Sequence, residues 1–528
     1  MRKVKAVFMA TTVFMAMGTL TACGNNSASS NSSGSTPNNA TSGSNSAQTS
    51  SSTSGNTLSI GLQADPATLD PALSSALVDR QIMFNIYDTL FALTPSGKIV
   101  GDLVTKWNVS SDGLTYTFHL RHGVKFQDGT PFNSQAVKFN LNRDMKPTSA
   151  RKSSLNAIKS IDTPDDYTVV LHLSKPYSPL INVLAGRAGM MVSPTAVKNE
   201  GANFANHPVG TGPYQLVNRV KGSTLTLEAN EHYWKGAPKI QRVVWHVFND
   251  PNVELSNLQS GAVQLIDQVP ASQLSSIKSN PNYIVSNTPG FGYQGFYLNT
   301  SEPPFNNRYL REAVDDAIDR KAIADVVFKG EASPAWSPFS PVSPVYDRAV
   351  STPPAPNGAK VKKLLKESGH SSGFSFTLQT ANSPISVQTA QMVQSMLSQY
   401  GIQMKIQQLD FDTLLSNNIN HSFQASALGW SGRLDPDQDT YSFWHTGGAN
   451  NGSKFSDSTV DQLLDKARKL SSMNQRKQVY DQFMKVMHQQ DPYIFLYYPN
   501  NVYAYSTSLH GFKAYPDGAF RLDQLSMS

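Results

Sequence analysis

Apolar and polar residues alternate along several short segments of the chain. Leu58 to Leu62 and Thr115 to Leu120 follow this two-residue period, and so do Leu225 to Glu228 and Val243 to Phe248. Such alternation predicts β-strands that bury one face and turn the other toward solvent. The first half of the chain is therefore expected to contain several half-buried strands.

The second half combines two hydrophobic periods within one short stretch. Phe374 to Thr380 is expected to form a strand, and Ser386 to Tyr400 repeats apolar residues at helical spacing. Gly401 stands where a helix C-cap favours glycine, and Ile402 to Ile406 alternates again. The stretch predicts a strand-helix-strand unit, which normally closes as a right-handed crossover onto a parallel sheet.

Three further segments carry helical patterns. They run from Asn306 to Phe328, from Thr459 to Leu470 and from Asn474 to Gln490. Asn306 follows two prolines and is expected to be the N-cap of the first of these helices. Strands and helices therefore mix along the chain, as in an α/β protein.

This α/β protein is expected to have two lobes. The chain has 528 residues, enough for more than one hydrophobic core, and 10% of them are aromatic. We expect lobe I at residues 58–287, lobe II at residues 288–500, and a return of residues 501–528 to lobe I.

The N-terminus has the layout of a secretory signal peptide. A basic opening at Arg2, Lys3 and Lys5 precedes an apolar stretch from Ala6 to about Met17, which is too short to span a bilayer. Cys23 is the single cysteine of the chain, and it follows Leu20, Thr21 and Ala22. The arrangement resembles a bacterial lipobox, so residues 1–22 are expected to be removed and Cys23 to carry the lipid. The alternative is an ordinary signal peptide with an incidental cysteine.

The segment after Cys23 is expected to be a tether, at residues 23–57. From Gly24 to Thr57 the chain consists almost entirely of Ser, Asn, Thr, Gly and Ala, without a charged residue. Such a segment buries too little apolar area to offset its ordering entropy, and it is expected to be disordered. A folded body from about Leu58 onward would then be held near the membrane and remain free to turn.

Net charge and cysteine usage narrow the function classes. The formal charge of +6 falls to +3 when residues 1–22, with three positive and no negative side chains, are removed. No run of basic residues occurs, so no nucleic-acid partner is expected. No second apolar stretch approaches the roughly 20 residues of a membrane span. Since the body has no cysteine, disulfides, thiolate metal sites and cysteine nucleophiles are excluded there.

Several ordered motifs resemble one known family, the family 5 extracellular solute-binding proteins. These proteins are the peptide and nickel receptors of ABC importers. The similarity covers essentially the whole body, and a series of motifs in the same order is more specific than any one of them. The motifs are Asp102 to Phe118, Leu120 to Phe132, Val209 to Tyr214, Asn230 to Gly236 and Leu310 to Arg320.

The resemblance implies a type II periplasmic-binding-protein fold. In that fold two α/β lobes are joined by a double-crossing hinge, and an extra subdomain, here expected at about residues 98–208, is inserted in lobe I. The solute is enclosed between the lobes and handed to the ABC permease subunits in the membrane. We expect a monomer that is lipid-anchored through Cys23 to the outer face of the cell membrane, in the Gram-positive manner.

The family's specificity segment corresponds here to Gly429 to Asp437. In the peptide receptors the third residue after the tryptophan is an aspartate that pairs with the peptide's amino group, whereas this chain has Arg433 there. A guanidinium suits a carboxylate or a phosphate and repels an ammonium group. Our hypothesis is that Trp430 forms an apolar wall, Arg433 pairs with a ligand carboxylate, and Asp435 or Asp437 meets a ligand amine. In the alternative, Arg433 and Asp435 form a salt bridge within the loop and touch no ligand.

Peptides are the expected solutes. Opines, modified amino acids and nickel chelates are the alternatives, and Arg433 favours the acidic members of that set. The lack of cysteine in the body and of ligand spacing among the 11 histidines argues against a bound metal.

A secreted hydrolase is the alternative from another class. Gly429 to Arg433 resembles a nucleophile elbow but ends in arginine where glycine is needed, and no His-Glu-x-x-His motif occurs. Ser275 to Lys278 matches Ser-x-x-Lys, but the companion motifs Ser-Asp-Asn and Lys-Thr-Gly are absent. We therefore expect no enzyme, no catalytic residue and no cofactor.

Overall fold

The computed structural model describes residues 56–528. The expected signal peptide, the lipidation site at Cys23 and the tether up to residue 55 lie outside the described residues. We use lobe I for residues 56–287 together with 501–528, and lobe II for residues 288–500. No helix among the described residues is long and apolar enough to cross a membrane.

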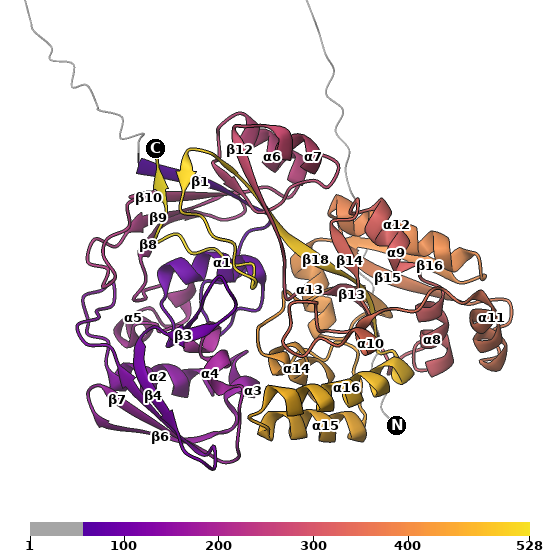
Figure 1. Ribbon diagram of the computed structural model, residues 1–528, viewed down its shortest axis with the longest axis horizontal. Coiled ribbons are helices and arrows are strands. Elements are labelled where there is room, and N and C mark those ends of the chain that lie inside the picture. The colour runs from indigo at the N-terminus through magenta and orange to yellow at the C-terminus, as the bar shows by residue number, and fades with distance from the viewer. Residues whose placement is uncertain (1–55) are drawn as a thin grey trace, which may run out of the picture. The chain divides into compact units, whose positions relative to one another are not determined.

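A large mixed sheet runs through both lobes (Figure 1). Its strands in spatial order are β16 (Gln403–Leu409), β15 (Ser375–Ala381), β17 (Ala425–Ala427), β13 (Gln294–Leu298), β18 (Tyr493–Ser506), β11 (Leu265–Ile266), β1 (Thr57–Leu62), β10 (Arg242–Val247), β9 (Thr224–Ala229) and β8 (Tyr214–Val220). Two further strands, β12 (Tyr283–Pro289) and β14 (Ala332–Pro334), also pair with β18.

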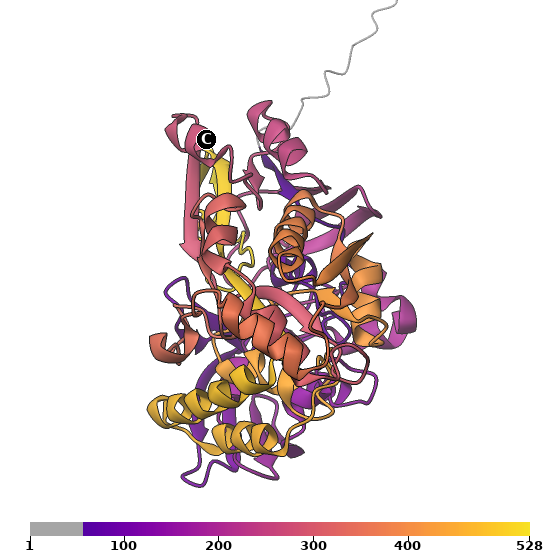
Figure 2. The same cartoon turned by 90° about the vertical axis from the view of Figure 1, so that its right-hand side faces the viewer.

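The long strand β18 connects the two lobes. Its first half pairs with β13, where Tyr493 is opposite Tyr297, and its second half pairs with β11, where Tyr505 is opposite Leu265. The strand β12 follows β18 antiparallel from Tyr283 to Pro289. Figure 2 shows the yellow strand β18 alongside this neighbour. Two crossing strands, β12 and β18, therefore link the lobes.

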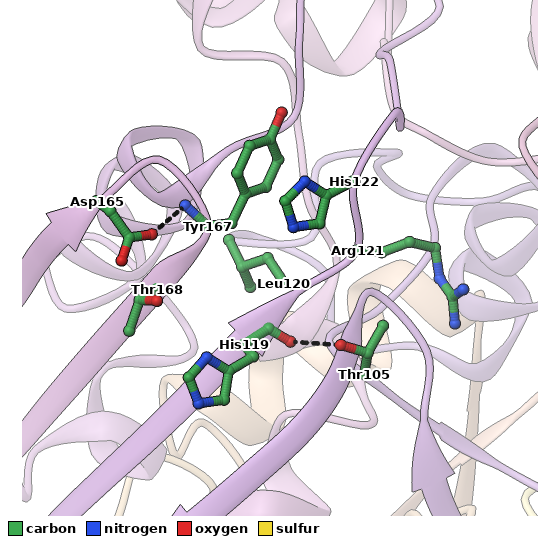
Figure 3. Close-up of a pocket in the computed structure, with 8 residues that line it drawn as sticks. All are labelled: Thr105, His119, Leu120, Arg121, His122, Asp165, Tyr167 and Thr168. Atoms are coloured by element: carbon green, nitrogen blue, oxygen red, sulfur yellow. Dashed lines mark hydrogen bonds between the residues drawn. The ribbon is translucent and has the colours of Figure 1, made fainter.

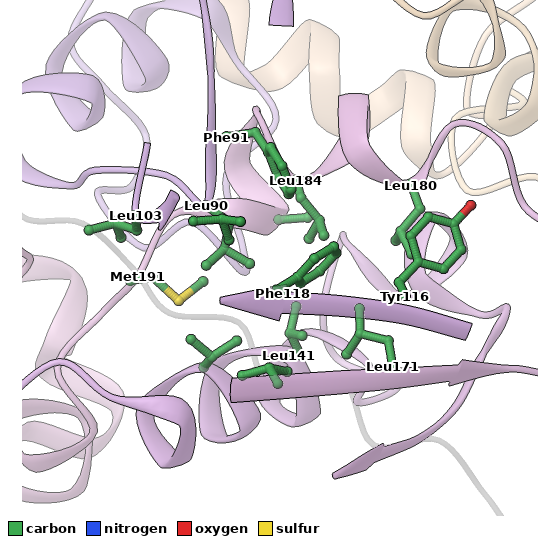
Figure 4. Close-up of a cluster of buried hydrophobic side chains, with 14 of the residues drawn as sticks. Leu90, Phe91, Leu103, Tyr116, Phe118, Leu141, Leu171, Leu180, Leu184 and Met191 are labelled. Carbon is green, nitrogen blue, oxygen red and sulfur yellow. The ribbon is translucent and has the colours of Figure 1, made fainter. Parts of the chain in front are cut away.

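A separate antiparallel sheet forms the region inserted in lobe I. Its strands in order are β4 (Val104–Val109), β5 (Thr115–Leu120), β7 (Thr168–Leu173) and β6 (Ile158–Asp165). Side chains such as Phe118 and Leu171 alternate inward from this sheet and pack with Phe91 and Leu141 into one buried cluster (Figure 4). The alternation in the sequence at Thr115 to Leu120 is the cause of this half-buried arrangement.

The remaining elements of lobe I surround these sheets. The helices are α1 (Leu77–Ile86), α2 (Ser134–Asp144), α3 (Lys152–Leu155), α4 (Leu180–Val183), α5 (Pro194–Glu200), α6 (Pro251–Gln259) and α7 (Leu274–Ser279), with 3-10 turns η2 (Arg187–Gly189) and η3 (Gly201–Asn206). Two short ribbons, β2 (Phe91–Leu93) with β3 (Ile99–Gly101) and β19 (Leu509–His510) with β20 (Ser526–Met527), complete the lobe.

Lobe II contains the predicted strand-helix-strand unit. The strands β15 and β16 are parallel, with Ser375 opposite Gln403, and α12 (Pro384–Ser398) connects them. Gly401 has a φ of 74°, and a Cβ there would lie 2.5 Å from the Ser372 carbonyl oxygen, so glycine is required at this turn. The prediction from the two hydrophobic periods is confirmed.

The other helices of lobe II are α8 (Arg308–Asp316), α9 (Arg320–Val326), α10 (Arg348–Ser351), α11 (Gly358–Glu367), α13 (Phe411–Ile419), α14 (Tyr441–Trp444), α15 (Ser458–Lys469) and α16 (Met473–Gln490), with the 3-10 turn η4 (Pro436–Asp439). The patterns at Thr459 to Leu470 and Asn474 to Gln490 correspond to α15 and α16. These two predictions are confirmed to within one residue at each end.

The single helix predicted at 306–328 is wrong, because the chain forms α8 and α9 there. The carboxylate of Asp319 accepts a hydrogen bond from the Ala322 N–H at 2.9 Å and starts a second helix. The side chain of Arg320 then turns into the protein, where its Nε donates to the Phe495 carbonyl at 2.6 Å. The apolar spacing continues across the break, so periodicity alone did not reveal it.

Candidate ligand-binding site

The predicted specificity segment follows β17 and is fixed by the backbone of lobe II. The N–H of Trp430 donates to the Tyr293 carbonyl, and the N–H of Tyr293 donates to the Trp430 carbonyl, both at 2.9 Å. Gly432 has a φ of 72°, and a Cβ there would lie 2.2 Å from the carbonyl carbon of Phe291. Only glycine allows the segment to approach Phe291 so closely, and the path of Arg433 is set by this turn.

The structure brings Trp430 and Arg433 together. The guanidinium of Arg433 lies 4.3 Å from the ring centroid of Trp430, within the range of a cation–π contact. Both residues bond to one oxygen of Asp439, the indole N–H at 2.9 Å and the backbone N–H of Arg433 at 2.8 Å. Phe443 meets the tryptophan ring edge-on at 4.9 Å. A flat apolar surface and a guanidinium are thus held in one rigid arrangement.

Asp435 lies completely buried and is paired within the chain. Its carboxylate accepts hydrogen bonds from both terminal nitrogens of Arg476 on α16, and it accepts a further one from the Asn182 side-chain amide at 2.7 Å. Burial by itself would raise the pKa of Asp435, but the guanidinium of Arg476 outweighs it and lowers the pKa below the usual value. The carboxylate is therefore charged and fully engaged, and Asn182 brings α4 of lobe I to it.

Asp437 has a matching arrangement one turn further along. The Nε and Nη2 of Arg468 on α15 donate to its two oxygens at 2.6 and 3.0 Å. The hydroxyl of Tyr177, from the inserted region of lobe I, donates to the same carboxylate at 3.3 Å. The backbone adds a direct link between the lobes, because the Ser178 N–H donates to the Arg468 carbonyl at 3.0 Å.

The expected alternative, a salt bridge between Arg433 and Asp435, does not form among the residues that the structure describes. Asp435 pairs with Arg476, and the guanidinium of Arg433 donates to the Ser431 hydroxyl at 3.1 Å and to the Gly432 carbonyl at 2.5 Å. That the carboxylates of Asp435 and Asp437 meet a ligand amine stays a prediction. Each of them already has an arginine partner, so their direct effect in this structure is to hold the loop.

Two residues of lobe I that no sequence motif indicated lie beside the segment. Arg80 on α1 donates to the Ser431 hydroxyl at 3.5 Å and to the Asp517 carbonyl. Arg187 in η2 is a charged neighbour of both Arg80 and Arg433. A sequence signal existed for Arg187, which is a charged residue inside an otherwise largely apolar stretch, but not for Arg80, which stands between Asp79 and Gln81. Sequence spacing does not place residues 80, 187 and 433 together.

A surface pocket of about 470 Å³ lies elsewhere, on the inserted sheet of lobe I (Figure 3). His122 stacks on Tyr167 with ring centroids 3.8 Å apart, and the Thr105 hydroxyl donates to the His119 carbonyl at 3.1 Å. Arg121 points away from these rings and lies over Trp234 at 4.4 Å. None of the predicted site residues lines this pocket, and no group of three or more potential metal ligands occurs in residues 56–528.

Comparison with known proteins identifies the class of this two-lobed molecule. The profile of the bacterial extracellular solute-binding proteins, family 5 Middle, matches residues 98–451. The chain belongs to this family, and the resemblance seen in its motifs is confirmed. It is thus a solute-binding protein of the family whose members serve ABC transporters.

Individual relatives cover nearly the whole body. The chain is 32% identical to the glutathione-binding protein GsiB of Salmonella choleraesuis (strain SC-B67) over an alignment of 478 residues. This alignment covers 87% of this chain and 92% of GsiB. The periplasmic binding protein DppA of Helicobacter pylori, in complex with the peptide STSA, superposes with a TM-score of 0.84 at 27% identity over 89% of this chain and 98% of DppA.

A third relative was solved with a different kind of solute. The structure of AgaA in complex with agropinic acid, from A. tumefacien R10, gives a TM-score of 0.83 at 28% identity over 89% of this chain and 99% of AgaA. Together these similarities confirm the expected type II fold of two α/β lobes.

Proposed function

We propose that this chain is the peptide-binding subunit of an ABC importer, which encloses a peptide between its lobes and delivers it unaltered to the membrane permease. The observation that carries the proposal is the convergence of both lobes on the segment 430–437. Asn182, Tyr177 and Arg80 of lobe I all contact it, so a solute held there would touch both lobes. A ligand favours lobe closure only through contacts that the open state lacks. The names of GsiB and DppA support a peptide as the solute.

Within this site we propose that Trp430 and Arg433 contact the peptide. Trp430 would cover an apolar part of it, and Arg433 would pair with a carboxylate. Asp435 and Asp437 would act one step further away, by fixing the loop through Arg476 and Arg468. Either aspartate could bind a ligand amine directly only if its salt bridge to the arginine were broken.

Native mass spectrometry of the protein, purified without denaturation, tests the solute. A bound mass that fragments as a peptide supports the proposal. A mass that matches an opine or a nickel chelate would replace the peptide by that solute class. Incubation with a peptide mixture tests the absence of catalysis, because the appearance of cleaved products would contradict a pure binding role.

An acidic small molecule such as an opine is the second candidate. It is favoured by the AgaA relative, which was solved with agropinic acid, and by Arg433 in place of the aspartate that the peptide receptors use. Calorimetric titration with an opine and with a peptide of the same net charge separates the two. The tighter ligand identifies the solute class.

The variant Arg433→Ala is expected to weaken binding of an acidic peptide by about 1.5–3 kcal/mol, the usual value for a hydrogen bond between charged partners. Isothermal titration calorimetry measures this change. The matched control is Arg308→Ala, because Arg308 is an exposed arginine of the same lobe and its removal should leave the affinity unchanged. Equal affinities of the Arg433→Ala variant and the unmodified protein would contradict a ligand contact at Arg433.

We also propose that Cys23 carries the lipid anchor on the outer face of the cell membrane, and that the mature protein is monomeric. Two acyl chains would hold it far more firmly than one, at about 0.8 kcal/mol for each buried methylene. In cells fed labelled palmitate, the unmodified protein should take up label and sediment with membranes. Cys23→Ala should take up none and appear in the medium, with an unchanged unfolding temperature, because Cys23 precedes the folded body. Label on the variant would contradict the assignment.

A further inference from the structure

Three buried arginines gather where the lobes meet. They are Arg80 on α1, Arg187 in η2 and Arg433 in the loop after β17, with exposed fractions of 1%, 3% and 8%. The first two belong to lobe I and the third to lobe II. Arginine is seldom buried without a carboxylate partner, since its charge is costly to remove from water.

None of the three forms an ion pair with any residue of 56–528. Arg80 and Arg433 donate to the same neutral oxygen, the Ser431 hydroxyl, at 3.5 and 3.1 Å. Their other acceptors are also neutral, namely the carbonyls of Asp517 and Gly432. The Nε of Arg80 is buried without a hydrogen-bond partner in the described part of the chain.

Arg187 is the least satisfied of the three. Its Nη2 donates to the Ala76 carbonyl, while its Nε and Nη1 are buried without a partner among the described residues. Burial first, and then the positive charges of Arg80 and Arg151, hold the pKa of Arg187 well below its usual value. Two donor nitrogens of a buried guanidinium are thus left for an acceptor that residues 56–528 do not supply.

The nearby carboxylates are engaged by other groups. Asp517 accepts two hydrogen bonds from Arg521, at 2.9 and 3.0 Å. Asp79 accepts from the Ser74 hydroxyl and from the Ala67 N–H, both at 2.8 Å. Asp439, already described, bonds to the indole of Trp430 and to the backbone N–H of Arg433. These carboxylates reduce the positive potential but do not bond to the three guanidinium groups.

We propose that Arg80, Arg187 and Arg433 together bind the anionic groups of the solute, and that this receptor selects acidic peptides with at least two carboxylates. The inference rests on the proposed peptide-binding function and specifies its substrate class. A single carboxylate compensates one guanidinium, whereas three guanidinium groups without ion pairs favour more than one negative charge. The arginines come from both lobes and repel one another. A bound anion offsets this repulsion and thereby favours closure of the lobes.

A matched set of peptides tests this selectivity by calorimetry. We expect the tripeptide Glu-Ala-Glu to bind at least about tenfold more tightly than Gln-Ala-Gln, which has the same length and shape but a single carboxylate. Equal affinities for the two peptides would overturn the inference and leave the peptide-binding function standing. If neither of these peptides binds, and no peptide of a broad library binds, the proposed function itself is overturned.

The variant Arg187→Met separates ligand recognition from a structural role. It removes a buried cation that has no ion-pair partner within residues 56–528, so the unfolding temperature of the ligand-free protein should stay equal or rise. The preference for Glu-Ala-Glu over Gln-Ala-Gln should fall by about tenfold, because Gln-Ala-Gln, with a single carboxylate, loses less affinity than Glu-Ala-Glu. A lower unfolding temperature together with equal losses for both peptides would show a structural role and overturn the inference.

Two further variants complete the test. Arg187→Lys retains the charge and should keep most of the preference for Glu-Ala-Glu. This variant tests the inference even if the methionine variant fails to fold. Arg219→Met is the matched control in lobe I, because Arg219 pairs with Asp65 at 2.9 Å. It should lower the unfolding temperature and leave the ratio of the two affinities unchanged.

Discussion

Replacement of Asp435 by asparagine is expected to lower the free energy of unfolding by about 3–5 kcal/mol, the usual cost of breaking a buried ion pair by removal of one partner. Asparagine has nearly the same size, so the loss comes from charge. Arg476 would stay buried, with 3% of its side chain exposed, opposite a neutral amide. Chemical denaturation followed by tryptophan fluorescence measures the change.

The matched control for this substitution is Asp325→Asn. Asp325 pairs with Lys321 four residues earlier, and both side chains are more than half exposed. The control should cost no more than about 0.5 kcal/mol, because water replaces the lost partner. Equal effects of the two substitutions would show that Asp435 and Arg476 do not depend on each other. The double variant Asp435→Asn, Arg476→Met should recover part of the loss, since it removes the uncompensated charge.

Replacement of Gly189 by alanine is expected to cost about 3 kcal/mol of folding free energy, at the upper end of the usual range for overpacking. A Cβ at this position would lie 1.7 Å from the Leu184 carbonyl oxygen, which is backbone and cannot rotate away. Gly189 ends the turn η2 that carries Arg187, and its carbonyl accepts a hydrogen bond from the Leu90 N–H at 2.9 Å. Chemical denaturation measures the stability, and calorimetry should also show weaker binding of acidic peptides.

Gly186, the N-cap residue of the turn η2, supplies the matched control. A Cβ at Gly186 would meet only the Val183 carbonyl oxygen, at 3.5 Å, which is an ordinary contact. Its φ of −110° and ψ of −154° are accessible to alanine. Gly186→Ala should therefore leave stability within about 0.5 kcal/mol or raise it slightly. A large loss for Gly186→Ala, or none for Gly189→Ala, would contradict the geometry of this turn.

Local patterns predicted much of the secondary structure correctly. The alternation at Leu58 to Leu62 and the unit from Phe374 to Ile406 are strands and a helix in the expected places. The helix break at Asp319 was missed, because one side chain capped a new helix without interrupting the apolar spacing. A helix boundary that depends on a single capping hydrogen bond leaves little trace in the spacing of apolar residues.

The candidate site was predicted only in part. The motif predicted a site at Trp430 and Arg433, and the structure shows that these two side chains lie together. Their contact with a ligand stays a prediction. The partners of Asp435 and Asp437 come from α16 and α15, more than 30 residues away, and from lobe I. Such pairings depend on how helices pack, which sequence spacing does not contain.

Ordered motifs in the sequence were enough to identify the family, and the setting of the single cysteine at position 23 predicts a lipid anchor. The sequence also indicated that strands and helices alternate, because hydrophobic period is a local property. Which charges are buried and which are paired became visible only in the folded protein. Arg80, Arg187 and Arg433 are far apart in sequence and become neighbours when the lobes meet. The electrostatic character of the site depends on the distances between charges and on their removal from water, and both are set by folding.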